Sequence, residues 1–154
     1  MSDSNGVVSG DEVMDTLLAA LDSRGMRYSA DADEGVVRIG FKGDDLPIRM
    51  EIHVGEAAVQ FKCPLDFRIA SGNYEKVFWE LNRINSGLSF GAFCIQPDGM
   101  VDFTYGFPFL ESDFSEEFLM AFIKAIAGTV DSHDGDLKRI AVSCPSGRVM
   151  YQRG

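Results

Sequence analysis

Apolar residues recur at helical spacing in three stretches of the chain. They predict amphipathic helices at about 11–24 and 74–86, and a third that starts near 114. We expect Gly128 to interrupt the third helix, with a weaker helical segment at 130–142 as a continuation or a separate short helix. The buried stripe predicted for the second helix consists of Tyr74, Val77, Phe78, Leu81 and Ile84.

Capping residues stand at the predicted starts of two helices. Ser9 and Glu12 have the spacing of a capping box, in which each side chain binds the backbone amide of the other. Asp113 and Glu116 have the same spacing before the third helix. We therefore expect Asp113 to be the N-cap of that helix.

Between the helices, apolar and polar residues alternate with period two, which is typical of half-buried antiparallel strands. The strands are predicted at 26–30, 37–41, 48–54, 59–63, 88–95 and 100–107. Pro64 is expected to end the fourth strand because proline has no amide proton. Pro97-Asp98-Gly99 is a strong turn signal between the last two strands.

Helices segregated from antiparallel strands indicate an α+β fold, a two-layer sandwich with the helices on one face of the sheet. A chain of 154 residues has the length of one domain. We expect a flexible tail at 1–8, a single domain at 9–142 and a C-terminal extension at 143–154.

The chain is acidic, with a formal net charge of −10 and a pI of about 4.5. Such a surface repels phosphate backbones and anionic lipids, so we expect no nucleic-acid and no membrane partner. The first residues lack the basic and apolar regions of a secretory signal, and an odd number of cysteines (Cys63, Cys94 and Cys144) suits a reducing compartment. We expect a cytoplasmic protein whose cysteines are small buried side chains.

Catalytic and metal-binding motifs are missing from the sequence. It has no Gly-rich phosphate loop, no GxSxG motif and no zinc-ligand spacing around His53 and His133, although a histidine could still meet a cysteine in space. The stretch 131–136 resembles a calcium loop but has Val142 where the loop glutamate belongs. We therefore expect no enzyme, no cofactor and no metal.

Phenylalanines concentrate in the second half of the chain, mostly as expected core residues. The segment Phe107-Pro108-Phe109-Leu110 differs because it lies in a predicted connection. Phe107, Phe109 and Leu110 are therefore candidates for an exposed partner-binding patch. The alternative is that they close the open edge of the sandwich.

The segment from the second helix onward resembles the YbjN family of bacterial sensory transduction regulators. The resemblance is carried by Leu81-Asn82-Arg83-Ile84-Asn85, by Phe90-Gly91-Ala92-Phe93 and by the run from Pro97 to Phe103, which includes Asp98 and Gly99. That family is similar in fold to the type III secretion chaperones, which are small, acidic and often homodimeric. The resemblance implies a non-enzymatic protein-binding module and a homodimer.

Asn82 and Asn85 lie on one face near the end of the second predicted helix. Their amides could bind the last helix carbonyls or an adjoining strand. The leading hypothesis is a chaperone-like or regulatory module that captures a protein segment on an apolar surface or sheet edge. The alternative is a small-molecule sensor with an apolar pocket between sheet and helices.

Overall fold

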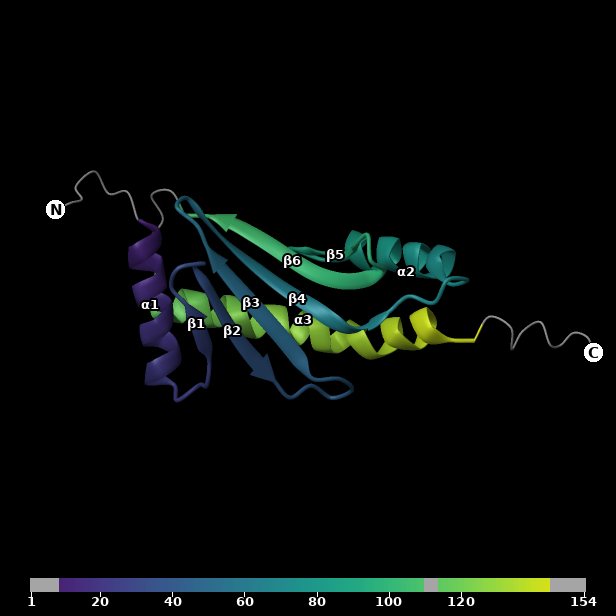
Figure 1. The fold of residues 1–154 in the computed structure, drawn as a ribbon, viewed down its shortest axis with the longest axis horizontal. Helices are drawn as coiled ribbons and strands as arrows, with labels where there is room; N and C mark the ends of the chain where they lie inside the picture. The colour runs from purple at the N-terminus through teal and green to yellow at the C-terminus, as the bar shows by residue number, and fades with distance from the viewer. Residues whose placement is uncertain (1–8, 110–113, 145–154) are drawn as a thin grey trace, which may run out of the picture.

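The computed structural model describes residues 9–109 and 114–144 (Figure 1). Helices and strands follow one another as α1 (Gly10–Ser23), β1 (Ser29–Asp31), β2 (Val36–Phe41), β3 (Ile48–Val54), β4 (Ala58–Arg68), α2 (Tyr74–Ser86), β5 (Ala92–Ile95), β6 (Met100–Pro108) and α3 (Glu116–Val142). Because helices and antiparallel strands form separate layers, the predicted α+β class is confirmed.

The strands form one antiparallel sheet in the order β1-β2-β3-β4-β6-β5. The long helix α3 runs across one face of this sheet (Figure 1). Helix α1 crosses the start of α3, and α2 packs beside its end near β5 (Figure 1). The edge strands are β1 and β5, which are the two shortest strands described.

The hydrophobic core lies between the sheet and the helices. Alternate residues of β3 and β4 point into it, as the period-two pattern predicts. The fully buried side chains include Met50, Ile52, Phe61, Phe93, Phe103, Leu119, Ile123 and Ile126. The remaining positions of β3 and β4 form a polar face that no described helix covers, with Glu51, His53 and Lys62 at its centre.

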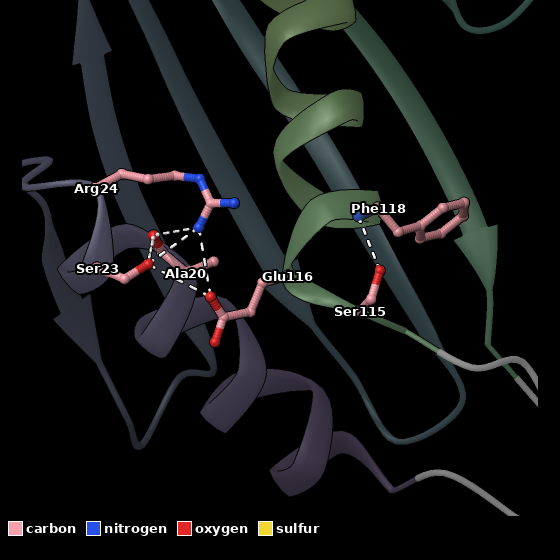
Figure 2. Close-up of polar contacts among 6 residues, drawn as sticks. All are labelled: Ala20, Ser23, Arg24, Ser115, Glu116 and Phe118. Atoms are coloured by element: carbon pink, nitrogen blue, oxygen red, sulfur yellow. Dashed lines mark hydrogen bonds and ion pairs between the residues drawn. The ribbon is translucent and has the colours of Figure 1, made fainter.

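Helix α3 is continuous, which corrects the prediction of a break at Gly128. Gly128 is exposed, with nothing near the position of a β-carbon, so the glycine only weakens the helix locally. The N-cap is Ser115, whose Oγ accepts a hydrogen bond from the Phe118 amide at 3.0 Å (Figure 2). The predicted N-cap, Asp113, lies outside the described residues.

Three strand boundaries also differ from the predictions by three residues or more. Strand β1 is Ser29–Asp31, and residues 26–28 of the predicted strand at 26–30 lie outside it. Strand β4 continues through Pro64 to Arg68, because the ladder to β3 already ends at Lys62 and does not need an amide at residue 64. Strand β5 begins only at Ala92, because the preceding Gly91 turns the chain with a φ of +70°. The capping box at Ser9 and Glu12 is confirmed, with hydrogen bonds of 2.9 and 3.2 Å.

A polar contact holds the end of α1 against the start of α3. Glu116 Oε1 accepts hydrogen bonds from Ser23 Oγ at 3.4 Å and from Arg24 Nη1 at 3.3 Å (Figure 2). Arg24 Nη1 also donates to the carbonyl of Ala20 at 3.3 Å (Figure 2). The contact fixes where α1 crosses α3 and leaves the N-terminal half of α1 beside the turns of the sheet.

Candidate binding surfaces

Phe107 and Phe109, the predicted partner-binding residues, lie inside the molecule. Phe109 is fully buried, and Phe107 is partly buried among Phe114, Phe118 and Phe122, with ring centroids 5.5–5.7 Å apart. The prediction that these residues form an exposed patch is wrong for Phe109, because the start of α3 folds back over the connection. Leu110 lies outside the described residues.

Asn85 closes the outer edge of the sheet at β5. Its Nδ2 donates to the Phe93 carbonyl at 3.0 Å, and its Oδ1 accepts from the Phe93 amide at 2.9 Å. The side-chain amide thus takes the place of a further strand. Of the two roles expected for it, this is the binding of an adjoining strand. Asn82 is exposed on the same helix.

The glycines of the family pattern hold tight turns. Gly91 has a φ of +70°, and a β-carbon there would overlap the ring of Phe103. Gly99 has a φ of +85° in the β5–β6 turn. Asp98 stabilises that turn, since its Oδ1 accepts from the Met100 amide at 3.0 Å. These residues have structural roles.

The outward side of α2 carries exposed aromatic residues. Phe78 is 57% exposed and Trp79 is 68% exposed, and these two side chains are called the α2 face below. The ring of Tyr74 packs 6.5 Å from that of Phe78. The prediction that Phe78 belongs to the buried stripe is wrong, because the buried residues of α2 are Val77, Leu81 and Ile84. An exposed pair of large aromatic side chains on a helix is a typical contact surface for another polypeptide.

A second surface, the α1 groove, lies between the first turns of α1 and two turns of the sheet. It has a volume of about 920 Å³ and is lined by residues 9–11, 14, 15 and 18 of α1 and its cap, 32–35 of the β1–β2 turn, and 54–56 of the β3–β4 turn. Gly10 lies against the Gly55 carbonyl, and Gly35 approaches the Val54 carbonyl so closely that a β-carbon there would lie 2.7 Å from it. Small residues therefore let the three segments meet and leave space above them.

On the uncovered face of the sheet, a hollow of about 480 Å³ contains a buried carboxylate. Asp102 is 3% exposed, and its Oδ2 lies 3.6 Å from Lys62 Nζ. Burial raises the pKa of Asp102, and the charge of Lys62 opposes that shift. Glu51 also lines the hollow, and its Oε1 lies 3.0 Å from His53 Nε2. This arrangement is a cross-strand ion pair on a polar face.

The contacts of the histidines and of Cys63 do not form a nucleophile–base pair. His53 contacts Glu51, and the ring of His133 packs 5.8 Å from that of Phe93. Burial raises the pKa of the Cys63 thiol to about 12, so this side chain remains protonated. Of the other cysteines, Cys94 and Cys144 are exposed, which corrects the expectation of buried side chains.

The acidic stretch 131–136 is part of α3, so it does not form a calcium loop. Asp131 Oδ1 accepts a hydrogen bond from the Asp44 amide at 2.8 Å, which ties the β2–β3 loop to the helix. Asp134 is buried. Across residues 9–109 and 114–144, no group of three or more His, Cys, Asp or Glu side chains is placed to hold a metal ion. In the same residues, no helix is both long and apolar enough to cross a lipid bilayer.

Comparisons with known proteins agree with this fold. A crystal structure described as "YbjN, a putative transcription regulator from E. coli" superposes with a TM-score of 0.61 at 13% sequence identity. The match covers 80% of this chain and 89% of that chain. A comparison with curated proteins gives no match. The YbjN family profile, described as "Putative bacterial sensory transduction regulator", matches residues 14–139, and the chain therefore belongs to the YbjN family.

Proposed function

We propose that this protein is a non-catalytic regulatory module that acts in the cytoplasm by binding another polypeptide on an apolar surface. The observation that carries the proposal is the α2 face, where Phe78 and Trp79 are more than half exposed. Elsewhere the large aromatic side chains near α3 are packed together. The free thiols of Cys63 and Cys94 suit a reducing compartment.

A second copy of the chain is the partner that best fits the α2 face. Trp79 lies midway between Glu75 and Arg83, which are one helical turn away on either side. Two antiparallel α2 helices related by a two-fold axis at Trp79 would place Glu75 of one copy beside Arg83 of the other, which also pairs with Glu80 of its own helix. Such a self-complementary surface is what a symmetric dimer requires. We therefore propose a homodimer through this face.

The packing of the interior favours polypeptide binding over the small-molecule sensor. The space between sheet and helices is filled by fully buried side chains, among them Phe61, Phe103 and Leu119. The hollows described above lie on the surface. A ligand between the layers would have to displace well-packed core residues, which costs several kcal/mol, on the order of a large-to-small core substitution.

The test compares the wild type with a Phe78→Ser, Trp79→Ser double variant. A matched control is Val142→Ser, which changes another exposed apolar side chain, 47% exposed, on α3. Sedimentation over a range of concentrations reports self-association, and affinity capture from the source cells reports other polypeptides. We expect the wild type and the Val142 variant to self-associate and the α2 variant to remain monomeric.

Two results would reject the proposal. One is a wild type that stays monomeric and retains no polypeptide. The other is an α2 variant that associates and captures as the wild type does. Because the substituted side chains are exposed, all three proteins should melt at nearly the same temperature when they are dilute enough to be monomeric. Equal melting under that condition shows that folding is not the cause of any difference.

A further inference from the structure

The α1 groove has an apolar floor. Met14 and Leu18 lie one helical turn apart on α1, and Val54 ends β3 beside them. All three side chains are only partly buried and pack against the edge of the core. Apolar surface left open at the bottom of a groove favours an apolar side chain from a ligand.

The rim of the groove is acidic on both sides of this floor. The carboxylates on it are all exposed: Asp11, Asp15, Asp33, Glu34 and Glu56. Among the described residues that line the groove, none is lysine or arginine. Uncompensated negative charge around an apolar floor favours a ligand that carries positive charge beside its apolar groups.

The spacing of the floor residues suits an extended chain. One turn of helix separates Met14 and Leu18 by about 6 Å along the axis. Alternate residues of an extended strand lie about 6.6–6.8 Å apart and point the same way. A segment with apolar residues at alternate positions could therefore place two of them on the floor, while the residues between them face the acidic rim.

We infer that the α1 groove binds an extended segment of another polypeptide in which basic and apolar side chains alternate. The inference rests on the proposed function in that the ligand is a polypeptide, but it concerns a surface other than the α2 face. The apolar side chains of the segment cover Met14, Leu18 and Val54, and its basic side chains pair with Asp15 and Asp33.

The test measures binding of a short synthetic peptide that alternates lysine and leucine to the full chain. Comparison peptides alternate lysine with serine, or glutamate with leucine. The groove variant is Asp15→Lys with Asp33→Lys. The matched control is Asp66→Lys with Asp136→Lys, which changes the net charge equally on the uncovered sheet face and near the end of α3.

We expect the lysine–leucine peptide to bind the wild type and the control, with affinity falling as salt is raised. The groove variant should bind it about ten-fold more weakly, because each reversal replaces an attraction by a repulsion. Both comparison peptides should bind weakly, since each lacks one of the two features that the groove recognises.

Several outcomes would overturn the inference. They are no binding of the lysine–leucine peptide to the wild type, equal binding by the groove variant, or equal binding of either comparison peptide. Binding that appears only after residues 145–154 are removed would instead assign the groove to this segment of the same protein, which contains Arg148 and Arg153. The α2 variant separates the two proposals, because its loss of self-association with intact peptide binding supports the groove independently.

Discussion

Removing the side-chain amide of Asn85 should weaken the fold at the β5 edge of the sheet. In the structure this amide binds both backbone groups of Phe93, at 2.9 and 3.0 Å, in the manner of a neighbouring strand. Asn85→Ala deletes both hydrogen bonds without removing any apolar contact in the core. The change therefore isolates the contribution of a polar group that closes an edge strand.

The magnitude follows from the number of bonds and their exposure. A hydrogen bond of this kind contributes about 1 kcal/mol net, with a spread of about 0.5 kcal/mol. Two bonds give about 2 kcal/mol, and because Asn85 is only partly buried, water can replace part of the loss. We expect the free energy of unfolding to fall by about 1–3 kcal/mol.

Urea unfolding followed by circular dichroism measures this loss. With a slope of about 2 kcal/mol per molar urea, the midpoint should fall by about 1 M. Asn82→Ala is the matched control, because Asn82 is exposed on the same helix, and it should change stability by less than about 0.5 kcal/mol. Asn85→Asp keeps the hydrogen-bond acceptor but turns a carboxylate oxygen toward the Phe93 carbonyl. Its free energy of unfolding at neutral pH should therefore fall by as much as that of Asn85→Ala, or by more.

Unfolding of Asn85→Ala and Asn82→Ala at the same urea concentration would contradict this role of Asn85. The role is also contradicted if Asn85→Asp is as stable as the wild type at neutral pH, because that result would mean that the donated hydrogen bond to Phe93 contributes nothing. A fall in the midpoint with a large change in slope would show that the variant no longer unfolds as one unit, and the comparison would then rest on amide exchange at Phe93.

Three further predictions concern buried and turn residues. Burial raises the pKa of Asp134 to about 6, so the native state holds this proton more tightly than the unfolded state, and stability should fall as pH rises from about 4 to 6. Asp134→Asn should remove that decline and raise the free energy of unfolding at pH 7 by about 1–2 kcal/mol. A variant whose stability depends on pH as that of the wild type does, measured by urea titration, would contradict the role of Asp134. Gly91→Ala should lower the free energy of unfolding by more than about 3 kcal/mol, because it combines a positive φ with steric overlap. In Gly106→Ala the new β-carbon meets no atom within 4 Å, so this control should be nearly neutral. Similar urea midpoints for the two variants would contradict the strain at Gly91. Measured at concentrations at which the protein is monomeric, Phe109→Ala should lower the free energy of unfolding by about 3–5 kcal/mol and Trp79→Ser by less than about 0.5 kcal/mol. The reverse order would restore the sequence-based view of Phe109 as a surface residue.

The sheet was well predicted because alternation is a local signal. The residues of β3 alternate without interruption from Ile48 to Val54, and the structure has the same boundaries. Errors arose where a distant element decides the outcome. Pro64 is tolerated in β4 because β3 no longer pairs there, and Gly128 is tolerated in α3 because neighbouring turns pack on the core.

The candidate site was predicted less well, because burial depends on what covers a residue. Phe109 looks exposed in a connection, but the aromatic residues at the start of α3 pack over it, with the Phe114 ring 5.7 Å away. Phe78 looks buried because it falls within a helical stripe. One signal could have located it: the apolar stripe of α2, with Trp79 included, is wider than the single face that a helix buries. The α1 groove could not be found by spacing, since its three segments meet only in the fold.

The two proposed surfaces should act independently, because α3 separates them. Helix α1 crosses the start of α3 and α2 packs near its other end (Figure 1), and α3 itself is about 40 Å long. Exposed charges separated by more than a Debye length, about 8 Å at physiological salt, are largely screened from each other. The Asp15→Lys, Asp33→Lys variant should therefore self-associate like the wild type, and the Phe78→Ser, Trp79→Ser variant should bind the lysine–leucine peptide like the wild type. If either variant impaired both activities while melting normally, one surface would have to serve both, and the assignment of separate partners to the α2 face and the α1 groove would be wrong.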